Sequence, residues 1–244
     1  MQIRSLETGR GWGWITEGFD LFRRSALLWI VIALLYTVVT SAISMIPLLG
    51  TAALTIIQPV LGAGFMVACR ELANGRELRI DQLFEGFRNK TQPLLTVGLL
   101  TFAGYVAIMM LVGGAFMLFG GVEAASGVFT GNYPEPHTRE EAMPLALGVL
   151  ASVLVGLALA VPLAMASWFA PALVWFDNLP AFDAMKQSLQ GCWKNVLPFM
   201  LYGLILGVLL IVAVLPFGLG LLVLIPAAVC SVYVSYLDIF ADTP

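Results

Sequence analysis

Positively charged residues are confined to three stretches of this chain, and this distribution strongly constrains its fold. Eleven of the twelve Lys and Arg residues lie in the N-terminal segment, within residues 70–90 or within residues 186–194, and Arg139 is the exception. The stretches between them are apolar and long enough to cross a bilayer. Because Lys and Arg gather in the cytoplasmic loops of polytopic membrane proteins, the pattern predicts such a protein with a defined orientation.

The composition indicates the same class. Hydrophobic residues make up 60% of the chain and charged residues 11%, and the mean hydropathy is +0.93. About a quarter of the residues in a soluble domain are charged. A soluble protein of this length could not cover so much apolar surface, so the sequence excludes a water-soluble globular domain. The net charge of −3 carries less information than the placement of the charges.

Six membrane spans are expected, since a helix needs about 20 mostly apolar residues to cross the hydrocarbon core. Two apolar blocks have double length, and each contains a break suited to a tight hairpin, at Pro47 and Gly50 and at Pro216 and Gly218. The predicted spans lie near residues 26–46, 51–69, 94–119, 145–171, 196–215 and 219–237. Residues 122–144 form the one sizeable external loop in this prediction. The fold class is therefore all-α.

The orientation follows from the basic stretches. They place both termini and the two longer basic loops in the cytoplasm, and they leave Arg139 outside. The residues up to Arg24 are polar and aromatic, which is unlike a cleavable signal peptide. We therefore expect the first span to act as its own insertion signal in a bacterial inner (cytoplasmic) membrane.

The segments that precede spans 1, 3 and 5 resemble one another. Residues 15–23 align without gaps to residues 80–88, matching Phe19 and Phe22 with Phe84 and Phe87. Both segments carry apolar residues at i, i+4 and i+7, the stripe of an amphipathic helix, and residues 182–192 keep this spacing more loosely. The pattern predicts three repeats of one interfacial amphipathic helix plus a transmembrane hairpin. The units cover approximately 12–69, 80–171 and 180–238 of a single integral membrane domain, 1–244.

The predicted repeat and the predicted role of its helices each have an alternative interpretation. Any cytoplasmic loop between spans tends to be amphipathic, so the likeness of the three segments can arise without a repeat. The helices themselves are expected to bury their apolar faces at the headgroup boundary, with Arg and Lys near anionic lipid. Trp12, Trp14 and Trp193 suit the same zone. The other use of such helices is a docking surface for a cytosolic partner.

Small residues recur on three of the predicted spans. They allow helix backbones to approach each other in lipid, and they predict close helix contacts within one protomer or in a homo-oligomer. The stripe on span 4 has five members, and spans 5 and 6 carry one pair each: Gly148, Ser152, Gly156, Ala160 and Ala164; Gly203 and Gly207; Ser231 and Ser235.

The spans offer little chemistry. No Asp, Glu, Lys, Arg or His lies within the core of a predicted span, which argues against ion-coupled transport because such transport uses intramembrane ionisable groups. Gln58 and Pro59 form the most polar interior feature. They could frame a small-molecule site, although Gln58 more simply hydrogen-bonds to a neighbouring helix. Four tyrosines are interpreted as packing or interface residues: Tyr36, Tyr105, Tyr202 and Tyr233.

The sequence contains no catalytic constellation. His137 with Glu135, Glu140 and Glu141 could weakly coordinate a divalent ion, but a solvated acidic loop is the favoured interpretation. The glycine-rich stretches are apolar and do not form a phosphate-binding loop. The three cysteines are far apart in sequence, so no structural disulfide is expected. We expect no catalytic, metal or cofactor site, no enzyme activity and no nucleic-acid partner.

A family resemblance is visible at the junction of spans 4 and 5. Its motif residues are Pro171–Asp177, Ala184–Ser188, Lys194–Asn195 and Pro198–Phe199. This pattern resembles bacterial six-span YciC-like inner-membrane proteins, a group that includes the membrane domain of some glycerophosphodiester phosphodiesterases. The Gly-Trp-Gly-Trp opening at residues 11–14 is similar to an uncharacterised proteobacterial branch of that group. In this chain Asn195 follows Lys194 directly, which departs from the group's spacing.

The resemblance implies a bacterial inner membrane and no hydrolase activity, because the sequence contains no soluble phosphodiesterase domain. The function expected is therefore that of a non-catalytic inner-membrane protein that scaffolds, assembles or regulates a membrane complex or a bilayer property. Membrane lipids, a membrane-protein partner or a second copy are the expected partners. The alternative is a carrier or channel for a neutral or lipid-like substrate.

Overall fold

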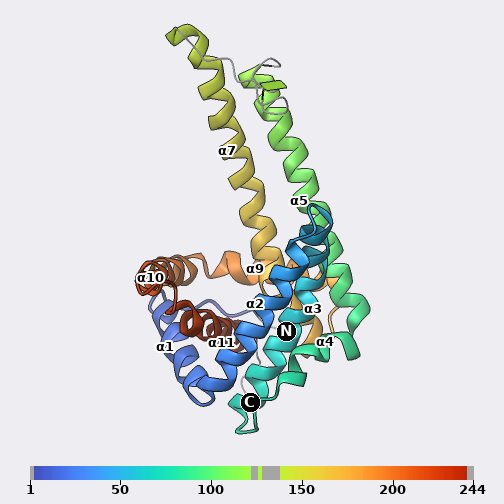
Figure 1. The fold of residues 1–244 in the computed structure, drawn as a ribbon, viewed down its shortest axis with the longest axis vertical. Coiled ribbons are helices and arrows are strands. Elements are labelled where there is room, and N and C mark those ends of the chain that lie inside the picture. Colours follow the sequence, from blue (N-terminus) through green and yellow to red (C-terminus); the bar gives the residue numbers. More distant parts are fainter. Residues whose placement is uncertain (1–2, 122–125, 128–137, 241–244) are drawn as a thin grey trace. The chain divides into compact units, whose positions relative to one another are not determined.

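The computed structural model describes residues 3–121, 126–127 and 138–240, and all regular elements in these ranges are helices (Figure 1). The chain divides into two compact units. The first contains Met1–Leu99 and Met165–Pro244, and the second contains Leu100–Ala164.

Six helices in the described ranges are long and apolar enough to cross a membrane. The predicted spans are confirmed in number and in place. Several helices are longer than predicted, in part because they continue into polar residues. The spans are α2 (Ala26–Ser44), α3 (Leu49–Ala73), α5 (Thr91–Gly120), α7 (Arg139–Trp168) continued by α8 (Ala170–Phe176), α10 (Val196–Val214) and α11 (Leu221–Phe240).

Both predicted hairpin breaks are turns. The α2–α3 turn contains Pro47, and Gly50 packs against the backbone of Ile43 and Ser44, where a side chain would collide. In the α10–α11 turn, Phe217 and Gly218 have φ values of 53° and 80°. Gly adopts positive φ at no steric cost, so Gly218 is suited to end α10 and reverse the chain.

Two of the three predicted amphipathic segments are continuous helices of 14 residues, α1 (Arg10–Arg23) and α9 (Ala181–Lys194). The prediction is wrong in part for the middle segment. It forms a 3₁₀ turn, η1 (Ile80–Phe84), followed by the single turn α4 (Glu85–Arg88). Gly86 lies against Val60 of α3, and Gly64 of α3 lies against Leu83. These backbone contacts hold the segment on α3 as two short turns, where one continuous helix was predicted.

The predicted apolar stripes of α1 and α9 are only partly buried within the protein. Phe19 stays 40% exposed and Phe182 stays 71% exposed. The buried positions are instead mostly small or aromatic: Gly11, Trp14, Gly18, Leu21 and Phe22 in α1, and Ala181, Ala184, Ser188, Gly191 and Cys192 in α9. The reason is close helix approach, since a Cβ at Gly18 would lie 2.6 Å from Ser231 Cα and one at Gly191 would collide with the Phe240 ring.

The core of the first unit is aromatic. Trp14 of α1 packs on Phe199 with ring centroids 5.0 Å apart, and Phe169 packs on Phe240 at 5.2 Å. Trp29 of α2 is completely buried. Large aromatic side chains bury much apolar area and prefer such tilted pairs. The core therefore joins α1 to the spans. Figure 1 shows α1 lying beside one of them, α11.

In the second unit, α5 and α7 pack through the predicted small-residue stripe. A Cβ at Gly148 would lie 2.6 Å from the Cα of Gly120, Ser152 donates a 3.3 Å hydrogen bond to the Val112 carbonyl, and Gly156 faces the Val112 side chain. The prediction of a close packing face is confirmed for these three positions, and the contact lies within the chain.

Candidate functional site

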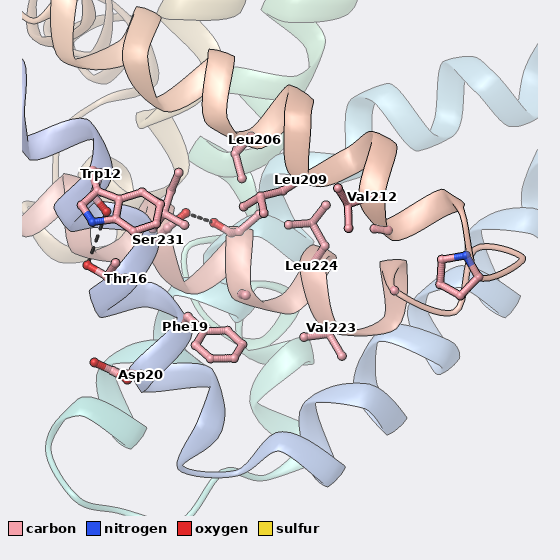
Figure 2. A pocket seen from close by; sticks show the side chains of 16 residues that line it. Trp12, Thr16, Phe19, Asp20, Leu206, Leu209, Val212, Val223, Leu224 and Ser231 are labelled. Atoms are coloured by element: carbon pink, nitrogen blue, oxygen red, sulfur yellow. Dashed lines mark hydrogen bonds between the residues drawn. The ribbon is translucent and has the colours of Figure 1, made fainter.

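An apolar groove lies in the first unit, between α1, α10 and α11 (Figure 2). Its volume is about 580 Å³, within the range of about 300–1,000 Å³ that is typical of small-molecule sites. Most of its lining side chains are apolar. It is lined from α1 by Trp12, Ile15, Thr16, Phe19 and Asp20, and from α10, α11 and their turn by Leu206, Leu209, Val212, Ala213, Pro216, Gly220, Val223, Leu224, Ala227, Ala228 and Ser231.

The arrangement of the two long helices explains where the groove lies. Next to the turn, α10 and α11 are in tight contact, since a Cβ at Gly220 would lie 2.6 Å from Ala213 Cα. Farther along α11, small residues at Ala227 and Ala228 leave space between the helices. Helix α1 forms one wall at this end, where Gly18 packs on Ser231. The groove is thus a product of three helices from opposite ends of the chain.

The hydroxyl groups at the α1 end of the groove are already engaged. Ser231 Oγ donates to the Ala228 carbonyl at 2.7 Å, which Figure 2 shows, and it lies 2.6 Å from Tyr202 Oη. Ser231 has one hydrogen to donate, so the Tyr202 hydroxyl donates to Ser231. This pair therefore gives the groove little hydrogen-bonding capacity, and the groove is suited to an apolar occupant.

A charged cluster positions α1 along the groove. Arg10 donates from Nη1 to Glu17 at 2.8 Å and from Nε to Asp238 of α11 at 2.8 Å, and the Trp14 indole donates to Asp238 at 2.8 Å. The hydrogen bond to Glu17 raises the pKa of Arg10 and desolvation opposes it, while Asp238 raises it further. Asp238 thus accepts hydrogen bonds from two side chains of α1. These bonds fix the rotation of α1 about its axis, so that one face of the helix lines the groove.

Asn195 attaches the N-terminal segment to the last hairpin. This residue is completely buried. Its Oδ1 accepts from the backbone N–H of Leu6, and its Nδ2 donates to the carbonyls of Arg4 and Gly191, all at 2.9 Å. Lys194 Nζ adds a 2.7 Å bond to the Ile3 carbonyl. A buried amide with all these bonds made is stabilising, so the Lys-Asn motif has a structural role here.

The acid of the proline-apolar-acid motif is also structural. Tyr236 of α11 donates to Asp177 at 2.7 Å. Close by, Lys90 Nζ donates to the Trp175 carbonyl at 2.6 Å and to Asn178 Oδ1. Desolvation lowers the pKa of Lys90, while the charge of Asp177 raises it. These bonds join the start of α5 to the end of α8 and to α11.

Ser188 has a similar role at the break between α7 and α8. Its hydroxyl donates to the Met165 carbonyl at 2.6 Å and accepts from the Phe169 N–H at 2.9 Å. These bonds satisfy backbone groups that the break frees. Three residues that carried the sequence resemblance, Asp177, Ser188 and Asn195, thus bind helix ends or neighbouring segments, and none of them lines the groove.

Opposite charges lie side by side at the α1 edge of the groove. Arg23 and Asp20 form a loose ion pair with an N–O distance of 3.6 Å, and their side chains are 66% and 67% exposed. The Arg23 guanidinium carbon lies 5.9 Å from the ring centroid of Phe19, which lines the groove. Both charges are therefore accessible beside the groove.

Gln58 and Pro59 are not among the residues that line the groove. Gln58 is exposed, and Pro59 is buried within α3. The tyrosine interpretation holds for Tyr36 and Tyr233, which pack on Phe65 and Phe176 respectively. Tyr105 is 42% exposed. The structure brings Tyr202 to the groove's end through its bond to Ser231.

Most of the predicted acidic loop lies outside the described residues. His137 and Glu135 lie outside the described residues, as does the side chain of Glu141, and Glu140 is exposed. Within the ranges that are described, no group of three His, Cys, Asp or Glu residues could hold a metal ion.

The cysteines show a proximity that sequence spacing does not reveal. Cys69 of α3 and Cys230 of α11 are buried free thiols with their sulfur atoms 3.8 Å apart. Cys192 is also buried, and desolvation raises its pKa to about 12. Since the thiolate is the reactive form of cysteine, burial of Cys192 disfavours reaction at its sulfur.

The fold and these sites define the class: an all-helical, polytopic integral membrane protein. No family model and no solved structure matches the chain. The chain is 30% identical over 260 residues to a Burkholderia thailandensis protein named "Probable inner membrane protein", and the alignment covers 98% of this chain and 94% of the relative. The chain belongs to the family of this inner-membrane protein.

Proposed function

We propose that this protein is a non-catalytic component of the inner membrane that holds a lipid-like molecule in the groove and so scaffolds or regulates a membrane complex or a bilayer property. The observation that carries the proposal is the groove itself. It lies between two helices of membrane-spanning length, has a mainly apolar lining and contains about 580 Å³. A space of this kind between spans would be filled by hydrocarbon.

The engagement of the polar side chains supports a non-catalytic role. Nucleophilic catalysis needs a hydroxyl or thiol activated by an adjacent base. Ser231 instead donates to a backbone carbonyl, and Cys192 is a protonated thiol. Asn195 and Asp177 connect helix ends. Each of these groups has a structural use.

The proposal includes the topology and the family relationships. Both termini are placed in the cytoplasm by the basic stretches. The equal lengths of α1 and α9, each directly before a span, support a repeated unit, although the middle segment differs. The motif residues support membership of the YciC-like group, whose junction they match.

Membrane lipids and a second copy are the proposed partners. Of the small-residue patterns, the pair Gly203 and Gly207 on α10 faces open space, because a Cβ at either position meets nothing within 4 Å. Small residues on an open helix face permit close association in lipid. A monomer in mild detergent for both the wild type and Gly207→Leu would count against this part of the proposal.

The groove can be tested by filling it. Ala228 lines the groove and is partly buried, whereas Ala158 lies exposed on α7. We expect native mass spectrometry of the wild-type protein, purified in mild detergent, to show one bound lipid. Ala228→Phe should lose this lipid, and Ala158→Phe should keep it at an unchanged thermal stability. Equal lipid content in both variants would refute the proposal.

A carrier for a neutral or lipid-like substrate is the second candidate. The accessibility of the groove from its α1 edge favours it, since Trp12 there is 53% exposed. A carrier would move a fluorescent lipid between the leaflets of a liposome, and Ala228→Phe would abolish that movement. Lipid binding without movement would favour the scaffold.

A further inference from the structure

We propose that the groove takes an acyl chain of a zwitterionic phospholipid whose headgroup ends in an ammonium, and that Asp20 and Arg23 bind the ammonium and the phosphate. This inference rests on the proposed function, in which the groove holds a lipid-like molecule, and it adds the chemical class of that molecule.

The position of the groove suits a chain that enters at α1. Its lining extends from Trp12 and Phe19 of α1 to Val212 and Val223 of the hairpin (Figure 2). The α10 part of the lining, from Leu206 to Ala213, corresponds to roughly 10 Å of helix rise. Since this wall is apolar throughout, an extended hydrocarbon chain matches it better than a compact polar solute.

The charges at the entrance identify the headgroup. Asp20 itself lines the groove, and the Arg23 guanidinium lies 5.9 Å from the centroid of the lining residue Phe19. The 3.6 Å separation between Arg23 and Asp20 and their exposure make their mutual attraction weak. A ligand that carries both a positive and a negative charge can therefore replace this ion pair with two stronger contacts, one to Asp20 and one to Arg23.

A phosphoethanolamine headgroup carries these two charges next to each other. Its phosphate matches the guanidinium, which binds phosphate oxygens through directed N–H groups. Its ammonium matches the Asp20 carboxylate. A phosphoglycerol headgroup would find Arg23 but would bring its negative charge beside Asp20 without a compensating cation. The Asp-Arg pair therefore favours the zwitterionic lipid over the anionic one.

A control pair with the same spacing exists on α9. Asp183 and Lys186 are also three residues apart, and neither lines the groove. Neutralising them alters the surface charge in the same way without touching the proposed headgroup site.

The test measures binding of phosphatidylethanolamine and phosphatidylglycerol with identical chains to the full-length protein in detergent. We expect the wild type to prefer phosphatidylethanolamine by on the order of fivefold, the size expected for exposed charge contacts. Asp20→Asn should abolish the preference and Arg23→Gln should weaken binding of both lipids. Asp183→Asn and Lys186→Gln should behave as wild type.

The outcomes separate this inference from the proposed function. If both lipids bind the wild type equally, or phosphatidylglycerol binds better, while Ala228→Phe still prevents binding, the headgroup assignment is overturned and the groove remains a lipid site. If Ala228→Phe leaves binding of both lipids unchanged, the groove is not the site, and the inference and the proposed function both fail.

Discussion

Gly18 of α1 lies directly against the backbone of Ser231 on α11, so close that a Cβ at Gly18 would be 2.6 Å from both the nitrogen and the Cα of Ser231. This contact seats α1 as one wall of the groove, next to the hydrogen-bonded hydroxyl groups of Ser231 and Tyr202. The absence of a side chain at Gly18 therefore allows α1 to dock closely on α11 beside the groove.

The first prediction concerns this contact. Gly18→Val should push α1 away from α11, because backbone atoms cannot yield to the new side chain. Overpacking of this kind costs about 1–3 kcal/mol, and we expect a lower melting temperature in detergent. Gly113→Val is the matched control, since a Cβ at Gly113 meets nothing within 4 Å. Similar melting temperatures for the two variants would show that α1 does not pack closely on α11.

The second prediction ranks two glycines of the α5–α7 contact. A Cβ at Gly148 would lie 2.6 Å from Gly120 Cα, whereas one at Gly156 would make an ordinary 3.5 Å contact with Val112. Gly148→Leu should therefore lower thermal stability more than Gly156→Leu. Val153→Leu, at an exposed position on α7, should be nearly neutral. The reverse order for the glycines would contradict the register in which α5 and α7 pack, and equal effects of all three would show that the small-residue stripe is not a packing face.

The third prediction concerns pH and the Cys192 thiol. Desolvation raises the pKa of Cys192 from 9.0 to about 12, so the folded state retains its proton where the unfolded state loses it. The contribution of this group to stability is fully present below pH 9 and is lost as the pH rises from about 9 towards 12. A Cys69→Ala/Cys230→Ala protein should thus lose more stability between pH 8 and 10.5 than its Cys192→Ala derivative, measured by thermal unfolding. Identical pH profiles would contradict the burial of this thiol.

The fourth prediction uses the two thiols that meet between α3 and α11. The sulfur atoms of Cys69 and Cys230 are 3.8 Å apart, and a small approach would bring them to the ~2.05 Å of a disulfide. A membrane-permeant oxidant should remove two hydrogen atoms and join the two helices, which peptide mass spectrometry detects. Cross-links from Cys192 to either residue, without the Cys69–Cys230 product, would contradict the packing of α3 on α11.

The fifth prediction tests the proposed topology. Alkaline phosphatase is active only in the periplasm, so a fusion at Tyr133 should be active and one after Phe240 inactive. A green fluorescent protein fused after Phe240 should fluoresce. Neutralising the five basic residues within 70–90 should give mixed orientation, because these charges hold the second hairpin. Phosphatase activity at the C-terminus would refute the topology with both ends inside.

The sequence predicts those parts of the fold that depend on local apolar length and local turn chemistry. The six spans and the turns at Pro47 and Gly218 are of this kind. The division of residues 80–88 was not predictable, since it depends on how Gly64 and Gly86 bring the segment onto α3. An apolar periodicity identifies the face that avoids water, but close approach at a glycine decides which side of the helix is buried.

The groove and its surroundings were not predictable for a related reason. Asn195 has its partners at Arg4 and Leu6, nearly the whole chain away, and no spacing rule connects them. The α1 lining and the hairpin lining are equally distant in sequence. A usable signal did exist in the small residues Ala213, Gly220 and Ala227, which mark where α10 and α11 touch and where they leave space.

The attachment of the N-terminal segment to Asn195 also sets an order of events during synthesis. Leu6 leaves the ribosome first, and its partner lies 189 residues later, so α1 must wait while four spans are inserted. During that time its apolar face has no protein to cover it, and the bilayer surface is the available shelter for an amphipathic helix. The groove therefore comes into existence as one of the last steps of biogenesis. A chain interrupted before α10 would still contain four spans, but it would lack the two helices that form the groove with α1.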